Sequence, residues 1–511
     1  MPTTRRQFLR DTALLAATAA ASPLFPRLRA ATPDSVNPKS PIQNPKSPNL
    51  LFIFPDQMRR HAMAFTHEDP VITPRLDRFA TQSLYLPNNT STFPLSSPFR
   101  GTMMTGRFPN ATHVNDNCTP NNPDVYLRRA ERCITDVLHD AGYHIGYIGK
   151  WHLTYPPKAA STKTGHRGSS WDAYTPPEDR HHIDYWHVSH SYGSDVTHLT
   201  YWDTDTPPDG GVPCDEWSPQ YEATRAIAYL ENAGNKLRDP AKPFALWVSM
   251  TPPHPPYDQS PERYRALYKN KTPADLLNRP NVQLEGQGKA ATDAALGYFS
   301  AVTGVDDQFG RILDTLDRLN LADNTIVVFT SDHGDMMGSH ALMGKQQPYE
   351  ESVNTPFLIR WPRRIKANST DDLLLSTPDL MPTLLGLMNL HPKIPEQVQG
   401  ADYSPIFLGL NDGAQRPAYA PYLDGAGTEG RRGVRTHTHT LTLAKPAAAK
   451  PAKPGKAGKP AKPAYPAVTL YDNRADPYQL RNIAAENPDI VAALTAHTHA
   501  WLTRAADPWT P

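Results

Sequence analysis

The chain has 511 residues and a formal net charge of only +1, so it lacks the general basic field of nucleic-acid-binding proteins, and we expect no nucleic-acid partner. Hydrophobic residues make up 39% and charged residues 20% of the sequence, as is typical of a soluble globular protein. The length exceeds what one simple core accommodates, which predicts one large and one small domain.

The N-terminal 30 residues (1–30) have the pattern of a twin-arginine (Tat) signal peptide. Arg5 and Arg6 precede the moderately apolar run 12–21. Because this run is too short to span a bilayer comfortably, we do not expect an integral membrane protein. We predict export by the Tat machinery and a periplasmic or secreted mature protein. Residues 31–48, which repeat Asn-Pro-Lys-Ser, are predicted to be a linker.

The chain contains three cysteines, Cys118, Cys133 and Cys214. This number is too small, and odd, for a disulfide framework. One bridge between Cys118 and Cys133 is compatible with an oxidising compartment, and the sequence leaves that pairing open. The absence of a C-x-x-C pair argues against a zinc or redox site built on cysteine.

Continuous apolar runs predict buried strands, and the segments between them predict helices. The predicted strands are residues 49–54, 143–148, 244–250, 325–330 and 356–359. The predicted helices are residues 74–83, 96–105, 124–141, 221–231, 290–320 and 378–388. Strands that alternate with helices indicate an α/β fold with a large, mostly parallel sheet flanked by helices. We assign the catalytic domain to residues 49–410.

Two further regions differ from this pattern. Residues 154–219 are rich in loops, His, Trp and Tyr, and are predicted either to shape a pocket mouth or to pack against the body. Residues 411–511 contain short alternating strands and a final helix, which predict a smaller C-terminal α+β subdomain with an antiparallel sheet. Within it, residues 444–466 are rich in Lys, Pro and Ala and are predicted to be a disordered insertion.

Polar side chains follow four of the predicted strands. These clusters are Asp56-Gln57, Lys150 with His152, His254, and Asp332-His333. The carboxyl ends of parallel strands meet at one edge of a sheet, so the clusters are expected to converge there. The predicted helix start at Ser96 could enter the same edge, where its unpaired N–H groups favour an anion.

The residue types at this edge suit two kinds of ligand. Two carboxylates, an amide and an imidazole are suitable ligands for a divalent cation. The surrounding groups that are cationic, or can become so, suit an oxyanion held against the metal. They are Arg100, Lys150, His152, His254 and Lys345.

Each cluster alone has a simpler explanation. Ser96 could be an N-cap with Arg100 as a solvated surface charge. Asp56 could cap a turn, and Lys345 could be an ordinary surface lysine. Five clusters at five strand or helix ends are difficult to explain in this way, so together they favour a functional site.

Several motifs resemble those of the sulfatase family, within the alkaline-phosphatase-like superfamily. The similarity extends from about Asn49 to Trp501. The matching segments are Ser96-Ser97-Pro98-Phe99-Arg100, Thr105-Gly106-Arg107, Gly149–His152, Ser331–Gly334, Gly344-Lys345, Tyr349-Glu350, Leu470-Tyr471-Asp472 and Asp476–Leu480.

The resemblance implies how the nucleophile and the cation are provided. Ser96 would be oxidised to formylglycine, whose hydrated aldehyde attacks sulfate, and Arg100 would hold this residue. The serine form of the motif implies a radical-type formylglycine-generating maturation enzyme as a partner. Gln57 fills a position that is a second Asp in many relatives. The residues that would bind one divalent cation, usually Ca²⁺, are Asp56, Gln57, Asp332 and His333.

The remaining site residues would bind sulfate and move protons. Lys150 and Lys345 would bind the sulfate oxygens. His152 would take the proton of the second hydroxyl when sulfate is expelled, and His254 would protonate the leaving alcohol, helped by Lys345. General acid catalysis of this kind contributes roughly 10²–10⁴ in rate.

The function predicted is hydrolysis of a sulfate ester, on a sulfated carbohydrate or an aryl sulfate. One alternative is a phosphatase or phosphodiesterase of the same superfamily that uses unmodified Ser96. Another alternative is an inactive member that binds sulfated glycans.

Overall fold

A ten-stranded mixed sheet forms the centre of the described chain, in the order β10-β2-β9-β8-β1-β7-β3-β4-β5-β6. The computed structural model describes residues 47–155, 174–189, 195–410, 415–445 and 465–510. The strands are β1 (Asn49–Pro55), β2 (Leu84–Tyr85), β3 (His144–Lys150), β4 (Tyr185–Ser189), β5 (Leu199–Asp203), β6 (Val212–Cys214), β7 (Phe244–Met250), β8 (Thr325–Thr330), β9 (Phe357–Arg360) and β10 (Ser369–Thr370).

The five central strands β8, β1, β7, β3 and β4 are parallel. On either side of them, β9 pairs antiparallel with β8, and β5 pairs antiparallel with β4. Alternate residues of β1 enter two different hydrophobic cores: Phe52 and Phe54 one, Leu51 and Ile53 the other. The sheet is therefore buried on both faces, which explains why β1 is a continuous apolar run.

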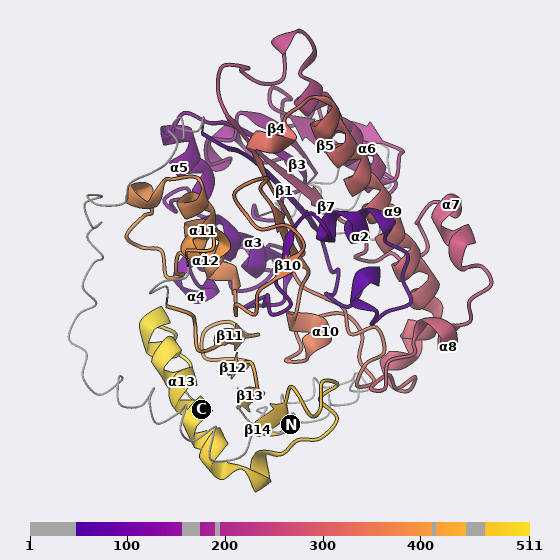
Figure 1. The fold of residues 1–511 in the computed structure, drawn as a ribbon, viewed down its shortest axis with the longest axis vertical. Coiled ribbons are helices and arrows are strands. Elements are labelled where there is room, and N and C mark those ends of the chain that lie inside the picture. Colours follow the sequence, from indigo (N-terminus) through magenta and orange to yellow (C-terminus); the bar gives the residue numbers. More distant parts are fainter. Residues whose placement is uncertain (1–46, 156–173, 190–194, 411–414, 446–464, 511) are drawn as a thin grey trace. The chain divides into compact units, whose positions relative to one another are not determined.

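Helices cover both faces of this sheet (Figure 1). One core contains side chains of α2 (Pro74–Ala80), α6 (Ser218–Glu231) and α9 (Ala291–Arg318). The other contains side chains of α3 (Ser96–Thr105), α5 (Ile134–Asp140), α11 (Leu380–Leu387) and α12 (Ser404–Phe407). The other α-helices within the described ranges are α4 (Pro109–Thr112), α7 (Glu262–Arg265), α8 (Pro273–Leu276), α10 (Glu350–Val353) and α13 (Pro488–Ala505).

A second, four-stranded antiparallel sheet lies near the C-terminus and packs against α13 (Figure 1). Its strands are β11 (Ala420–Leu423), β12 (Arg431–Arg435), β13 (His439–Ala444) and β14 (Val468–Asp472). Its core also takes in Phe93, Leu95 and Phe108, and the Phe108 and Trp501 rings stack at 5.6 Å. The predicted α/β class with a smaller antiparallel sheet is thus confirmed.

One predicted helix is wrong, and one segment contains strands that the sequence did not reveal. The helix expected over 124–141 is confined to α5, because Cys133 and Asp136 form a capping box that starts the helix there. The segment 154–219, predicted to be rich in loops, also contains the short strands β4, β5 and β6 in its described part. Polar residues such as His187 and Asp203 interrupt the apolar runs in these strands, so the sequence pattern does not reveal them.

Several predictions concern residues outside the described ranges. They are the signal peptide (1–30), most of the linker (31–48) and most of the insertion (444–466). Cys118, Cys133 and Cys214 are free and buried, so Cys118 and Cys133 do not form the bridge that the sequence left open. Among the described helices, none combines the length and apolar character needed to cross a membrane.

Candidate active site

The predicted site residues converge at the carboxyl ends of the central parallel strands. Asp56 directly follows β1, and Lys150 is the last residue of β3. Lys150 Nζ donates to Asp56 Oδ2 at 2.6 Å. The backbone N–H of His254, after β7, donates to the Asp56 carbonyl at 3.1 Å. The expected convergence of strand-end residues is therefore confirmed for these elements.

Ser96 begins α3 inside this cluster. Its Oγ donates to Asp56 Oδ2 at 3.0 Å and lies 3.2 Å from His333 Nε2. The N-cap of α3 is Leu95, not Ser96, so a purely capping role for Ser96 is wrong. Leu95, which directly precedes α3, is buried in the core of the small sheet. Ser96 itself is fully buried.

Arg100 lies one helical turn after Ser96 and is also fully buried, which excludes the surface-charge alternative. Its Nη2 contacts Asp56 Oδ2 at 3.3 Å and Asp332 Oδ2 at 3.4 Å. Its Nη1 donates to the Lys150 carbonyl at 2.7 Å and to Ser249 Oγ at 2.6 Å. One guanidinium thus joins the ends of β1, β3, β7 and β8.

A glycine allows this close approach of β3 to β7. Gly149 has φ +94°, and a Cβ there would lie 2.1 Å from the Ser249 carbonyl oxygen. Only glycine combines this backbone conformation with this contact, so the Gly-Lys pair at 149–150 has a structural cause. The next site residue, His152, is buried, and its carbonyl accepts from Ser97 Oγ at 2.6 Å.

Asp56, Asp332 and His333 form a group that could hold a metal ion. Each offers a ligand atom, and the three atoms lie within 4.8 Å of one another. Asp56 Oδ1 is buried without a hydrogen-bond partner among the described residues. An unpaired buried carboxylate oxygen is costly unless a cation satisfies it, so the donor set fits a divalent cation.

The pKa values of the two carboxylates, Asp56 and Asp332, are shifted in opposite directions. Burial raises the pKa of Asp56, but the facing Lys150 and Lys345 ammonium groups outweigh it and hold the pKa well below its ordinary value. Burial and the neighbouring Asp56 charge raise the pKa of Asp332 to about 7. Burial and the nearby Lys345 charge lower the pKa of His333, which favours the neutral imidazole that metals bind.

The cationic groups around the cluster are themselves perturbed by burial. Burial lowers the pKa of Lys150 to about 8, although Asp56 opposes this effect. Burial and the Lys345 charge hold the pKa of His254 well below its ordinary value. Lys345 Nζ lies 2.9 Å from Gln57 Oε1 and 3.9 Å from Asp56 Oδ1. A region with this many positive groups is suited to an anionic substrate.

Three contact residues were not predicted as part of the site. Ser249 accepts from Arg100, while Tyr257 and Asp335 contact Gln57. Asp335 closes the Ser331–Asp335 segment, and its position two residues after His333 was the available signal. Nothing in the sequence links Tyr257 to Gln57, because the two are 200 residues apart.

A second group of potential ligands, Cys133, Asp136 and His181, has a structural explanation. Asp136 accepts from the Cys133 N–H at 2.7 Å, as part of the capping box of α5. The same carboxylate lies 3.3 Å from His181 Nδ1 and 2.7 Å from His182 Nδ1. Its oxygens are therefore satisfied by protein donors.

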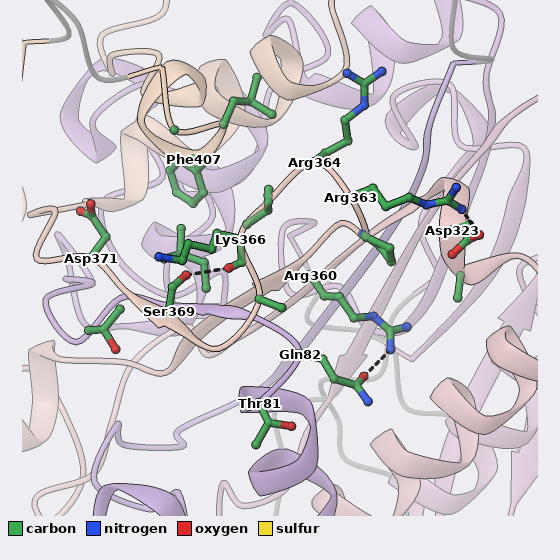
Figure 2. A pocket seen from close by; sticks show the side chains of 18 of the residues that line it. Thr81, Gln82, Asp323, Arg360, Arg363, Arg364, Lys366, Ser369, Asp371 and Phe407 are labelled. Atoms are coloured by element: carbon green, nitrogen blue, oxygen red, sulfur yellow. Dashed lines mark hydrogen bonds and ion pairs between the residues drawn. The ribbon is translucent and has the colours of Figure 1, made fainter. Parts of the chain in front are cut away.

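A cavity of about 920 Å³ lies elsewhere in the fold, between the β9–β10 region and α12 (Figure 2). Asp323 precedes β8, and Arg360 ends the antiparallel β9, so both lie near the amino ends of the central strands. In this cavity Arg363 pairs with Asp323, and Arg360 donates to Gln82 Oε1 at 2.8 Å. This cavity is therefore separate from the Ser96 cluster.

The fold and the strand-end cluster together define a hydrolase of the alkaline-phosphatase-like superfamily. The model of the sulfatase family matches residues 48–390, and that of the N-sulphoglucosamine sulphohydrolase C-terminal region matches residues 338–443. The chain belongs to the sulfatase family and is a sulfuric ester hydrolase.

Known relatives support this assignment. The chain is 39% identical to an endo-4-O-sulfatase of Bacteroides thetaiotaomicron, over 92% of this chain and 95% of that protein. It is 32% identical to a ulvan-active sulfatase of Formosa agariphila, over 88% of this chain and 80% of that protein. A solved Bacteroides thetaiotaomicron structure, from work on the metabolism of glycosaminoglycans, has a TM-score of 0.80 and 37% identity, covering 91% of this chain and 97% of that one.

Proposed function

We propose that this sulfatase removes sulfate from a sulfated polysaccharide, using formylglycine formed from Ser96 and one bound Ca²⁺. The observation that carries the proposal is the position of Ser96 Oγ, 3.0 Å from Asp56 and 3.2 Å from His333. The nucleophile precursor thus touches two of the three residues that could hold a metal ion. The glycan class is supported by the relatives, whose names include an endo-4-O-sulfatase and a ulvan-active sulfatase.

Asp56, Gln57, Asp332 and His333 would hold the cation, which supplies positive charge for the sulfate oxygens. Formylglycine supplies, as its hydrate, the attacking oxygen. Arg100 holds the start of α3 against the two carboxylates, and Lys150 and Lys345 bind the sulfate oxygens.

Proton transfer is assigned to two histidines. His254 donates a proton to the leaving alcohol oxygen, with Lys345 beside it. An anionic substrate between them would favour the protonated form of His254 that this step needs. His152 accepts a proton from the residue 96 hydroxyl when sulfate leaves.

Maturation and export belong to the same proposal. The serine at position 96 favours a radical-type formylglycine-generating enzyme as the maturation partner. The Arg5-Arg6 pattern favours Tat export to the periplasm or beyond.

The test combines mass spectrometry with a substrate panel. A Ser96 peptide from the active protein, made in its native host, should be two hydrogens lighter than the serine form, or appear as its hydrate. Sulfated oligosaccharides should be hydrolysed with Ca²⁺ and not after chelation, and the matching phosphate esters should serve as controls. Intact serine in active protein, together with faster phosphate-ester hydrolysis, would instead establish the phosphatase alternative. Glycan binding without turnover, unchanged in Ser96→Ala, would establish the non-catalytic one.

A further inference from the structure

Asp335 is a fully buried carboxylate, two residues after His333, whose oxygens each accept from two donors. Oδ2 accepts from Gln57 Nε2 at 2.5 Å and from Tyr257 Oη at 2.7 Å. Oδ1 accepts from the backbone N–H of Met337 at 2.8 Å and of Gly344 at 3.1 Å. Asp335 therefore connects the side chain of Gln57 to the loop that carries Lys345.

These contacts fix which way the Gln57 amide points. An ionised carboxylate only accepts hydrogen bonds, so the NH₂ end of Gln57 must face Asp335. The carbonyl end then faces the opposite way, where Oε1 accepts from Lys345 Nζ at 2.9 Å. Lys345 Nζ in turn lies 3.9 Å from Asp56 Oδ1, so Gln57 Oε1 and Asp56 Oδ1 face the same ammonium group.

We infer that Asp335 and Gln57 act as one acid–amide pair, in which Asp335 is the positioning residue that presents the Gln57 carbonyl oxygen to the bound cation. A second acidic residue at position 57 would carry a negative charge. In this chain the corresponding charge lies on Asp335, which contacts Gln57. This inference rests on the proposed cation-dependent function. The inference adds that the Gln57 amide is held in the orientation needed for cation binding only when residue 335 is an acid.

The pair predicts a distinctive pattern in exchange variants. Gln57→Glu places two carboxylates against each other, where like charges repel. Asp335→Asn lets the Gln57 amide turn, because an amide partner can accept or donate. The double variant Gln57→Glu/Asp335→Asn restores a donor facing a carboxylate and keeps the total charge of the pair. The two single changes should therefore be harmful, and the second should rescue the first.

The test measures Ca²⁺ binding to the chelator-stripped, full-length mature protein by isothermal titration, and the Ca²⁺-induced rise in the unfolding temperature. Asp335→Asn should bind Ca²⁺ about 10–100-fold more weakly than wild type, the usual effect of changing a residue behind a metal ligand, and Gln57→Glu should also bind Ca²⁺ more weakly than wild type. The double variant should recover most of this loss. The matched control is Asp379→Asn, another buried carboxylate, which accepts from Ser376 and Ala401 and should leave Ca²⁺ affinity unchanged.

The outcomes separate this inference from the proposed function. If wild type binds no Ca²⁺, the cation-dependent function fails, and the inference fails with it. If wild type binds Ca²⁺ and the single variants bind equally well, only the acid–amide pair is overturned. Additive losses without rescue in the double variant also overturn the pair. Should Asp335→Asn fail to fold, the comparison of Gln57→Glu with the double variant still decides, and Tyr257→Phe, which removes one donor to Asp335, should weaken Ca²⁺ binding to a smaller extent.

Discussion

His254 shows how the strand ends place the side chain that we propose as the proton donor. Its backbone N–H donates to the Asp56 carbonyl at 3.1 Å, which holds the residue beside one of the three potential metal ligands. Its ring Nδ1 lies 2.8 Å from the Pro255 carbonyl, and a carbonyl oxygen can only accept, so Nδ1 carries a proton in this contact. The proton donation proposed for His254 therefore falls to the other ring nitrogen, Nε2.

The proposed acid role of His254 can be tested through the leaving group. His254→Ala should lower kcat/KM for a sugar sulfate by about 10²–10⁴, but by less than about tenfold for 4-nitrophenyl sulfate, because a nitrophenolate leaves without protonation. Steady-state kinetics of both substrates on wild type and variant provide the measurement. An equal loss on both substrates would assign His254 to sulfate binding.

On the scale of elements, α6 carries a buried acid that the chemistry does not use. Glu222 is fully buried, and its Oε1 accepts from Tyr201 Oη at 2.9 Å. Its Oε2 has no hydrogen-bond partner among the described residues. Burial raises the pKa of Glu222 well above its ordinary value, so the folded protein keeps a proton that the unfolded chain releases.

This linkage has a definite sign. Above the ordinary carboxyl pKa the unfolded chain binds fewer protons than the folded protein, so stability falls as pH rises towards the folded-state pKa. Glu222→Gln removes this loss and should raise the unfolding temperature at about pH 8 by at least about 2 °C, the shift that roughly 1 kcal/mol produces in a large domain. Near pH 5 the gain should be much smaller. Calorimetry at both pH values provides the check, and a gain that does not depend on pH would refute the assignment.

Most of the residues at the carboxyl edge of the central sheet could be predicted from the sequence, whereas the hydrogen bonds that orient them could not. Apolar runs such as 49–54 and 325–330 mark the strands, and the residues that follow them mark the edge. By contrast, Asp335 to Gln57 is a contact across 278 residues, and only the folded chain reveals it. The strands β4 to β6 were missed for a different reason, because polar side chains interrupt their apolar pattern.

At the scale of the whole molecule, the small sheet holds the segment before Ser96 and the segment beside Lys345. The Leu423 N–H of β11 donates to the Thr92 carbonyl at 2.9 Å, just before α3. Arg431 Nη2 of β12 donates to the Gln346 carbonyl at 2.7 Å, next to Lys345. The Gln346 N–H donates to the Pro94 carbonyl at 3.1 Å, so the segment beside Lys345 is also bonded directly to the segment before α3.

Arg431→Ala should therefore weaken sulfate binding without removing any group that touches substrate. KM should rise by roughly 3- to 30-fold, with a smaller change in kcat, because Lys345 loses its fixed position and small displacements in a site are costly. Arg416→Ala is the matched control, since Arg416 is an arginine of the same region that pairs with Asp371 and Asp372 at the surface. A KM unchanged by Arg431→Ala would show that the small sheet does not support the Lys345 loop.

The complete burial of Ser96 also sets an order of events in time. A separate enzyme that oxidises this side chain needs it in its own active site, and the packed α3 does not offer it. If Ser96 is oxidised as proposed, the oxidation must happen on a nascent or unfolded chain, before Leu95 docks into the core that includes Leu441 and Leu470. Because Leu441 and Leu470 follow Leu95 in the chain and are synthesised later, synthesis would leave time for this modification, and premature folding would leave residue 96 as serine.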